Sequence, residues 1–165
     1  MTLIDERSTP SLREIIGELL RKSKSADIAV SHFRLVGLDL MREELERVES
    51  CRVILRQLNA ANLQEVEQAK VLAGFARSGR LAVRAAPHHV WTPDLSVFQT
   101  HAGRSVALVG AHYFGQPYPL FGLALTCVTD DPVQVRMCAT RFEDLWAAGY
   151  DVLPVICEAL DRVAL

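Results

Sequence analysis

The first periodic stretch of the chain predicts an amphipathic helix. It opens with Ser11 and Glu14 at the spacing of a capping box, in which each side chain satisfies a backbone N–H of the other residue. Five apolar residues then follow with the i, i+3, i+4, i+7, i+8 spacing of one helical face: Leu12, Ile15, Ile16, Leu19 and Leu20. Lys22 and Lys24 stand at the end of this stretch, where the helix dipole favours cations.

Later stretches have the same periodicity and predict further helices. They cover about residues 38–48, residues 62–78 and the segment that follows Asp131. Gly79 comes directly after the second of these stretches, and glycine is the residue type that most often ends a helix. Asp131 and Pro132 supply an N-cap and a proline at the first helical position, which is where a helix tolerates proline best.

Short apolar runs rich in β-branched residues lie between these helices and predict buried strands. We expect strands at about 27–33, 51–56, 81–85, 95–98, 106–109 and 120–128, and a last strand and helix from 151 to the end. Gly103 lies in the short loop that joins two of these strands, which is typical of an antiparallel hairpin. Alternating helices and strands with a late hairpin predict an α/β fold, in which helices cover both faces of a mixed sheet.

The composition is that of one globular domain. The chain has 165 residues, of which 50% are apolar and 23% charged, so it can bury a core. We expect a single domain over residues 1–165, with its core at about 11–150 and a C-terminal strand and helix at 151–165. The charge balance of 18 − 20 = −2 shows no overall basic excess that would indicate nucleic-acid binding, although a local patch is compatible with it.

The N-terminus and the apolar runs favour a cytoplasmic protein. Asp5 and Glu6 stand where a signal peptide carries cations, and no apolar segment of the required kind follows them. Residues 105–129 include no Asp, Glu, Lys or Arg, and a run of that length can span a bilayer. The glycines and prolines in its middle favour two buried strands joined by a loop, so we expect no membrane insertion.

Cysteine usage favours reduced, buried thiols over a disulfide or a metal site. No two cysteines form a C-x-x-C pair, and each has apolar residues within a few positions along the chain. The four are Cys51, Cys127, Cys138 and Cys157. No set of His, Cys, Asp and Glu has the spacing of metal ligands, so we expect neither a metal nor another cofactor. A zinc site made by His88, His89 and a cysteine is the weaker alternative.

The predicted strands place basic side chains at one edge of the sheet. In sheets of this kind, ligands bind beyond the carboxyl ends of the strands. The basic residues at or just after these ends are His32, Arg34, Arg56, Arg84, His88, His89 and His112. If the strand ends converge, these four histidines and three arginines share one crevice and form a site for an anion.

Taken in order, several segments resemble a phospholipase D-like domain. They are Ala26-Asp-Ile-Ala-Val-Ser-His-Phe-Arg-Leu-Val-Gly-Leu38, Ser78-Gly-Arg-Leu-Ala-Val-Arg84, Val106-Ala-Leu-Val-Gly110 and Arg141-Phe-Glu-Asp-Leu-Trp-Ala-Ala148. The resemblance covers roughly residues 11–150 and implies an α-β-α sandwich. Members of that family hydrolyse or transfer phosphodiesters of phospholipids or nucleic acids through a covalent phosphohistidine, without a metal. The family also pairs two such lobes, which implies a homodimer here.

The catalytic signature of that family is absent from this chain. It consists of His-x-Lys, four further residues and Asp, then a Gly-Ser-x-Asn turn and a glutamate on the next strand. One histidine attacks phosphorus, a second from the paired lobe protonates the leaving oxygen, and the lysine neutralises the phosphoryl oxygens. The corresponding positions hold Thr92, Asp94, Gln99, Ala111 and Tyr113, with the glutamate position near Ala124. No lysine follows Lys70, so a shifted alignment does not restore the motif.

We therefore expect a phospholipase D-like scaffold without the family's activity. It would act in protein–protein assembly or bind a phosphate-bearing ligand such as nucleic acid. In one alternative, His89 or His112 serves a diverged metal-independent phosphodiesterase or nuclease, with Arg56 or Arg84 in place of the lysine. In another, the domain binds nucleic acid without catalysis, with an affinity that falls steeply with salt. The aromatic and proline-rich loop at 112–119 either forms a recognition surface or packs over the vacated site without a binding role.

Overall fold

The computed structural model shows a mixed α/β fold. It describes residues 1–4, 10–31, 42–56, 70, 73–74, 77–90, 93–110, 125–155 and 158. The strands are β1 (Thr2–Ile4), β2 (Ser23–Val30), β3 (Ser50–Leu55), β4 (Leu81–Ala85), β5 (Leu95–Thr100), β6 (Ser105–Gly110), β7 (Thr126–Thr129) and β8 (Tyr150–Asp151). The helices that pack on them are α1 (Leu12–Lys22), α3 (Arg42–Arg47) and α6 (Pro132–Ala148).

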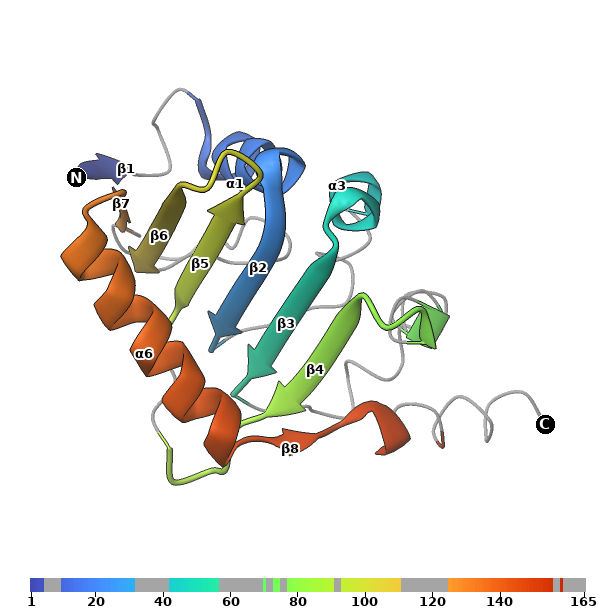
Figure 1. Cartoon of the computed structure of the whole chain (residues 1–165). Helices are drawn as coiled ribbons and strands as arrows, with labels where there is room; N and C mark the ends of the chain where they lie inside the picture. Colours follow the sequence, from blue (N-terminus) through green and yellow to red (C-terminus); the bar gives the residue numbers. More distant parts are fainter. Residues whose placement is uncertain are drawn as a thin grey trace.

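The described strands form one sheet in the order β1-β7-β6-β5-β2-β3-β4-β8 (Figure 1). β2, β3 and β4 are parallel neighbours, and the remaining pairs are antiparallel. The ends of β2, β3, β4 and β6 and the start of β5 therefore lie along the same side of the sheet. We call this side the carboxyl edge, and its backbone includes Ser31, Arg56, Ala86, Asp94 and Gly110.

One face of the sheet is covered by α1 and α3. The capping box predicted at the start of α1 is present, because the Ser11 hydroxyl accepts from Glu14 N and the Glu14 carboxylate accepts from Ser11 N. Apolar residues of α1 pack with Leu45 of α3 and with alternate residues of the central strands in one core cluster. The amphipathic pattern read from the sequence thus places this helix on the sheet as expected.

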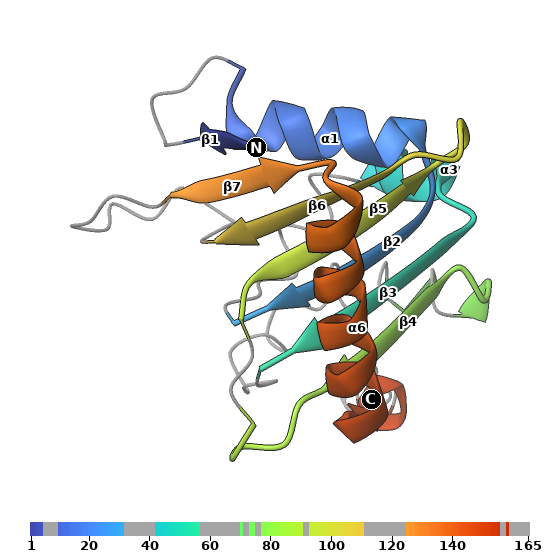
Figure 2. The same cartoon turned by 60° about the vertical axis from the view of Figure 1, so that its left-hand side comes forward.

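Among the described residues, α6 is the helix that covers the opposite face (Figure 2). It begins where predicted, since the Asp131 carboxylate accepts from Val133 N and Gln134 N at 3.0 Å each and Pro132 occupies the first turn. Val135, Phe142 and Leu145 are its buried residues. α6 begins next to the end of β7 and ends beside β4, so it crosses the sheet toward the carboxyl edge (Figure 1).

Arg52 fastens α6 to the middle of the sheet. Its guanidinium binds the carboxylate of Asp27 on β2 through two hydrogen bonds of 2.7 and 2.9 Å, and that of Glu143 on α6 through two of 2.6 and 3.2 Å. It also lies 4.9 Å from the ring centre of Phe142 and 5.3 Å from that of Trp146. One cation on β3 therefore links a neighbouring strand with the covering helix.

Several predicted element bounds agree with the structure, and others shift. β4 has the predicted bounds, and β5 and β6 form the predicted antiparallel hairpin, with Gly103 at a φ of 76° in its loop. β2 begins four residues before the predicted start and directly follows α1. β1 is a strand that the sequence analysis missed, since three residues are too few to show alternation.

Parts of other predicted elements lie outside the described residues. Of the helix predicted at 62–78, Lys70, Ala73, Gly74 and Arg77 are described and helical, and Gly79 has the positive φ of 73° expected at its end. Residues 38–41 before α3, residues 120–124 before β7 and most residues after 155 are outside the description.

The described cysteines carry free thiols. Cys51 is buried, while Cys127 and Cys138 are partly buried, and Cys157 lies outside the described residues. Burial raises the pKa of Cys51 to about 12, so its thiol is a poor nucleophile in the folded state.

No helix in the described segments is both long enough and apolar enough to cross a bilayer. Within the uncharged run at 105–129, the described residues include the strands β6 and β7, as the sequence predicted.

Replacing Arg52 should weaken the attachment of α6. Arg52→Met removes four hydrogen bonds and leaves Asp27, whose side chain is only 22% exposed, without its cation. We expect the free energy of unfolding, measured by urea denaturation, to fall by about 1–3 kcal/mol. Arg13→Met on the exposed side of α1 is the control and should change stability by less than about 0.5 kcal/mol. Equal effects of the two substitutions would contradict this role of Arg52.

Candidate functional site

Three of the four described members of the predicted anion site, Arg56, His88 and His89, follow strands that end at the carboxyl edge. Hydrogen bonds from Arg56 N to Val30 O (3.1 Å) and from Ala86 N to Leu55 O (2.7 Å) continue the ladders at this edge, so the ends of β2, β3 and β4 are adjacent. Arg56 is exposed there, and His88 and His89 are exposed in the turn that follows β4. The other predicted members, His32, Arg34 and His112, lie outside the described residues.

The exposed basic residues of this edge have free side chains. The side chains of Arg56, His88 and His89 have no hydrogen bond or ion pair within the described part of the chain. A guanidinium and imidazoles in this state can bind an anion in water without first releasing a protein partner.

Arg84 has a different environment from Arg56. Its Nη1 donates to the Trp146 carbonyl at 2.6 Å, and its guanidinium lies 4.6 Å from the centre of the Trp146 ring. Trp146 belongs to the last turn of α6, where a cation stabilises the carbonyl end of the helix. The structure therefore shows Arg84 bound to α6, one position before the end of β4.

Asp94 connects three strand ends at the carboxyl edge. Its Oδ1 accepts a hydrogen bond of 2.5 Å from the backbone N–H of Ser31, directly after β2. Its backbone carbonyl accepts a hydrogen bond of 3.0 Å from the N–H of Gly110, the last residue of β6. Asp94 itself directly precedes β5, so a single residue joins the ends of β2 and β6 to the start of β5.

Asp94 occupies the position where the family resemblance places the catalytic lysine. A lysine ammonium only donates hydrogen bonds, whereas the Asp94 carboxylate accepts one from a backbone N–H. The carboxylate also brings negative charge, which repels the oxygens of a phosphoryl group. The charge at this position is therefore the reverse of what the family reaction needs.

The remaining signature positions are described only in part. Gln99, where the resemblance places the family's aspartate, is exposed near the far end of β5, and the Ser25 hydroxyl donates to its Oε1 at 3.5 Å. Thr92, Ala111, Tyr113 and Ala124 lie outside the described residues.

Position 110 requires glycine because of its backbone conformation and because of the residues close to it. Its φ of 131° is a conformation that other residues rarely adopt. A Cβ at this position would lie 2.1 Å from Leu125 O and 2.9 Å from the Cα of Thr126. The end of β6 and the residues that lead into β7 therefore approach each other more closely than a side chain allows.

The sequence analysis missed the charged cluster of Arg52, Asp27 and Glu143. Hydrogen bonds to Asp27 and Glu143 raise the pKa of Arg52, and hydrogen bonds from Arg52 lower the pKa of Glu143. The available signal was the presence of two opposite charges inside apolar strands, which pair directly once β2 and β3 are parallel neighbours. The cluster holds α6 to the sheet, since Arg52 binds Asp27 on the neighbouring strand and Glu143 on the helix at the same time.

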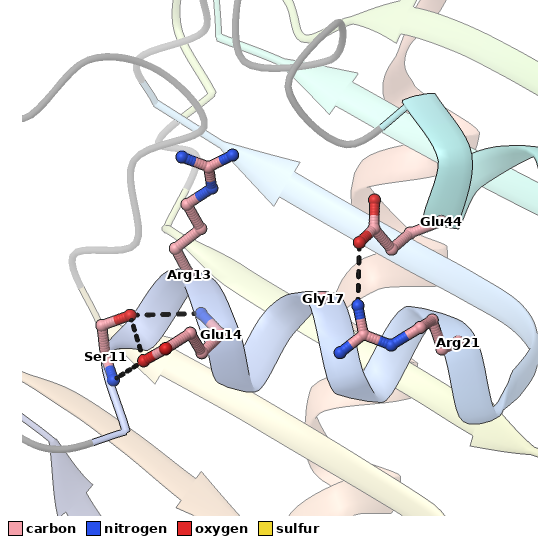
Figure 3. A pocket seen from close by; sticks show the side chains of 6 residues that line it. All are labelled: Ser11, Arg13, Glu14, Gly17, Arg21 and Glu44. Atoms are coloured by element: carbon pink, nitrogen blue, oxygen red, sulfur yellow. Dashed lines mark hydrogen bonds and ion pairs between the residues drawn. The ribbon is translucent and has the colours of Figure 1, made fainter.

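A second group of charges lines a hollow of about 390 Å³ between α1 and α3 (Figure 3). Arg21 Nη1 lies 2.9 Å from Glu44 Oε1, and Glu14 is held in the capping box by Ser11. Arg13 is the remaining cation of this hollow. Of the four charged residues, Arg21 and Glu44 pair with each other and Glu14 is bound in the capping box. The hollow therefore has no net charge of one sign that would attract a charged ligand.

The described residues also limit metal chemistry. They include no group of three or more His, Cys, Asp and Glu side chains that are close enough to hold a metal ion. The exposed basic side chains that the described chain presents at the carboxyl edge are those of Arg56, His88 and His89.

No family model matches the chain, and no curated protein sequence matches it. Solved structures match its fold. TrmBL2, an archaeal chromatin protein with a novel mode of DNA binding, superposes with a TM-score of 0.61 at 16% identity, over 92% of this chain and 53% of its own. Nuc, a phospholipase D family member from Salmonella typhimurium, gives 0.59 at 13% identity, over 91% of this chain and 95% of its own. NucT from Helicobacter pylori gives 0.58 at 9% identity, over 91% and 97%.

These likenesses establish the fold. The chain has the phospholipase D-like α/β fold that the order of its sequence segments predicted. It spans about half the length of TrmBL2, so TrmBL2 has a further part to which this chain does not correspond.

Replacement of Gly110 should be far more damaging than replacement of a glycine with open space around it. Gly110→Ala combines backbone strain with a contact of 2.1 Å, so we expect a loss of at least about 3 kcal/mol of folding stability or no folded protein. Gly103→Ala is the matched control, because its φ is also positive at 76° but nothing lies within 4 Å of the added Cβ. That substitution should cost about 1–2 kcal/mol. Thermal and urea denaturation of both variants checks the difference, and similar losses would contradict it.

Proposed function

We propose that this chain is a non-catalytic phospholipase D-like module that acts in protein–protein assembly or in binding a phosphate-bearing ligand. The observation that carries the proposal is the hydrogen bond between the Asp94 carboxylate and Ser31 N–H. It supports the proposal because the residue in place of the catalytic lysine holds two strands together and carries the opposite charge. Thr92 in place of the nucleophilic histidine supports it from the sequence.

The exposed basic side chains of the carboxyl edge support ligand binding as one use of the module. Arg56, His88 and His89 are exposed and have no partner side chain within the described residues. Binding needs only attraction and fit, whereas phosphoryl transfer also needs an attacking group and charge neutralisation at the phosphoryl oxygens. Arg56, His88 and His89 at the carboxyl edge are of residue types that can attract a phosphate group.

Non-catalytic nucleic-acid binding is the second candidate, and the likeness to TrmBL2 favours it. TrmBL2 is a DNA-binding protein of this fold, although the two chains share only 16% identity and half of its length. The net charge of −2 requires that any such contact uses a local patch. Arg56 and the two neighbouring histidines are the residues available for it at the carboxyl edge.

The competing enzyme hypothesis uses His89 or His112 in a diverged phosphodiesterase or nuclease. A catalytic histidine is normally oriented by a hydrogen bond from its second ring nitrogen. His89 is exposed and has no such bond among the described residues, which favours the non-catalytic proposal. His112 lies outside the described residues and is tested only by experiment.

A hydrolysis assay distinguishes the proposal from the enzyme hypothesis. We expect no release of p-nitrophenol from bis(p-nitrophenyl) phosphate and no cleavage of DNA, with or without a chelator, because the lysine position carries a carboxylate. Metal-independent turnover that disappears in His89→Ala or His112→Ala would overturn the proposal. His101→Ala, in the exposed β5–β6 loop at the opposite side of the sheet, is the matched control and should have no effect on any turnover.

Nucleic-acid binding has a separate signature in its salt dependence. If the carboxyl edge contacts about two phosphates, the affinity for a labelled DNA duplex should fall about tenfold between about 50 and 200 mM salt. Arg56→Ala should weaken binding, whereas Arg104→Ala should not, because Arg104 is an exposed arginine at the opposite side of the sheet. Fluorescence anisotropy measures both effects. Absent or salt-insensitive binding would eliminate this second candidate.

A further inference from the structure

No other described helix or strand is seen to pack on the outward face of α6. Among the described residues, α6 is the helix on its side of the sheet, and the residues opposite its buried face are exposed (Figure 2). Val133 is 56% exposed and Met137 is 68% exposed there. With Thr140, Asp144 and Ala147 these residues repeat at spacings of four and three, which is the spacing of a stripe that packs on another helix.

Three charged residues line this surface: Arg136 and Asp144 have opposite signs and lie at equal distances from Thr140, and Arg141 has an interaction of its own. A hollow of about 490 Å³ on this surface is lined by Val133, Arg136, Met137, Thr140, Arg141 and Asp144. Arg136 lies four residues before Thr140, and Asp144 lies four residues after it. Neither charge has a hydrogen bond or ion pair among the described residues. They stand about 12 Å apart along the helix axis, which is too far for them to pair with each other.

The charges on the outward face of α6 are complementary to those of a second copy of the helix that runs in the opposite direction. A two-fold axis through Thr140, perpendicular to α6, exchanges positions at equal distance on either side of that residue. Arg136 of one copy then faces Asp144 of the second copy, and the same pair forms again on the other side of the axis. Parallel helices would instead place like charges opposite each other, so the charges select the antiparallel orientation.

The side chains along the stripe are compatible with close packing of two such helices. At the axis Thr140 meets its own copy, and Val133 meets Ala147 of the second copy. These are small or medium side chains, which allow two helices to approach. The inward side of α6 is held by Arg52 and Arg84, so the helix is already ordered and loses little freedom on docking.

We propose that a second copy of this chain docks on the outward face of α6, antiparallel to it, with two symmetric Arg136–Asp144 ion pairs. This inference deepens the assembly role proposed above and rests on that role for its purpose. Asp144 on the stripe, matched by Arg136 at the same distance from Thr140, favours a second copy over a nucleic acid or an anionic membrane as the occupant. A single pair of helices buries a smaller area than standard interfaces, which bury at least about 1,200 Å². The expected dissociation constant is therefore micromolar.

Charge exchange between the two positions gives a sharp test. Sedimentation velocity from about 1 to about 200 µM should show a monomer–dimer equilibrium for the unmodified chain. Arg136→Asp and Asp144→Arg should each weaken self-association at least tenfold, because each creates two like-charged contacts. An equimolar mixture of the two variants should associate again, since both contacts then join opposite charges. Arg13→Asp on α1 makes the same change in net charge as Arg136→Asp and should leave association unchanged.

Each other outcome overturns the proposal. A chain that stays monomeric at the highest concentration has no such interface, and a dimer that persists in both single variants forms through another surface. Weakened single variants that do not recover on mixing would rule out the antiparallel pairing. Circular dichroism and thermal unfolding confirm that the variants are folded. Detection of phosphodiester hydrolysis would overturn the non-catalytic function but would leave these association results unchanged.

Discussion

The hydrogen bond between the Asp94 carboxylate and Ser31 N–H is the constraint on which the carboxyl edge depends. Together with the bond from Gly110 N to Asp94 O, it ties β2, β5 and β6 at the point where this fold places ligands. An ammonium has no lone pair to accept the proton of Ser31, so a lysine at position 94 cannot make the same bond. Asp94 therefore stabilises the sheet at the position where the family resemblance places a group suited to phosphate.

The basic residues of the chain divide into two groups with different roles. Arg52 and Arg84 lie on the face covered by α6, where each stacks on an aromatic ring and binds an oxygen of that helix. Arg56, His88 and His89 lie at the carboxyl edge and have no partner within the described chain. The first group stabilises the fold, and the second group is available for a ligand. The sequence alone does not separate them, because both groups follow or belong to the same strands.

Local signals predicted the elements that the structure confirms, and long-range pairing explains the ones that were missed. The capping box at Ser11, the Asp131 N-cap and the bounds of β4 depend on a few neighbouring residues, so they are readable from the chain. β1 exists because Leu3 pairs with Cys127, more than a hundred residues away. The cluster around Arg52 likewise requires both the parallel register of β2 and β3 and the path of α6. At the site, the absence of the family's His-x-Lys signature was readable from the sequence, whereas the hydrogen bond that Asp94 makes depends on the neighbouring strand ends.

The path of α6 also determines what its proposed dimer can do. The helix runs from the side opposite the carboxyl edge toward that edge, where Gly149 and Tyr150 follow it beside β4. Two antiparallel copies joined at Thr140 therefore direct their carboxyl edges to opposite ends of the helix pair, at least about 25 Å apart for 17 residues. Catalysis in the family resembled here needs a histidine from each of two paired lobes in one site. A dimer that separates the two edges cannot assemble such a site, but it presents two independent binding surfaces, which is the arrangement that a non-catalytic module can use.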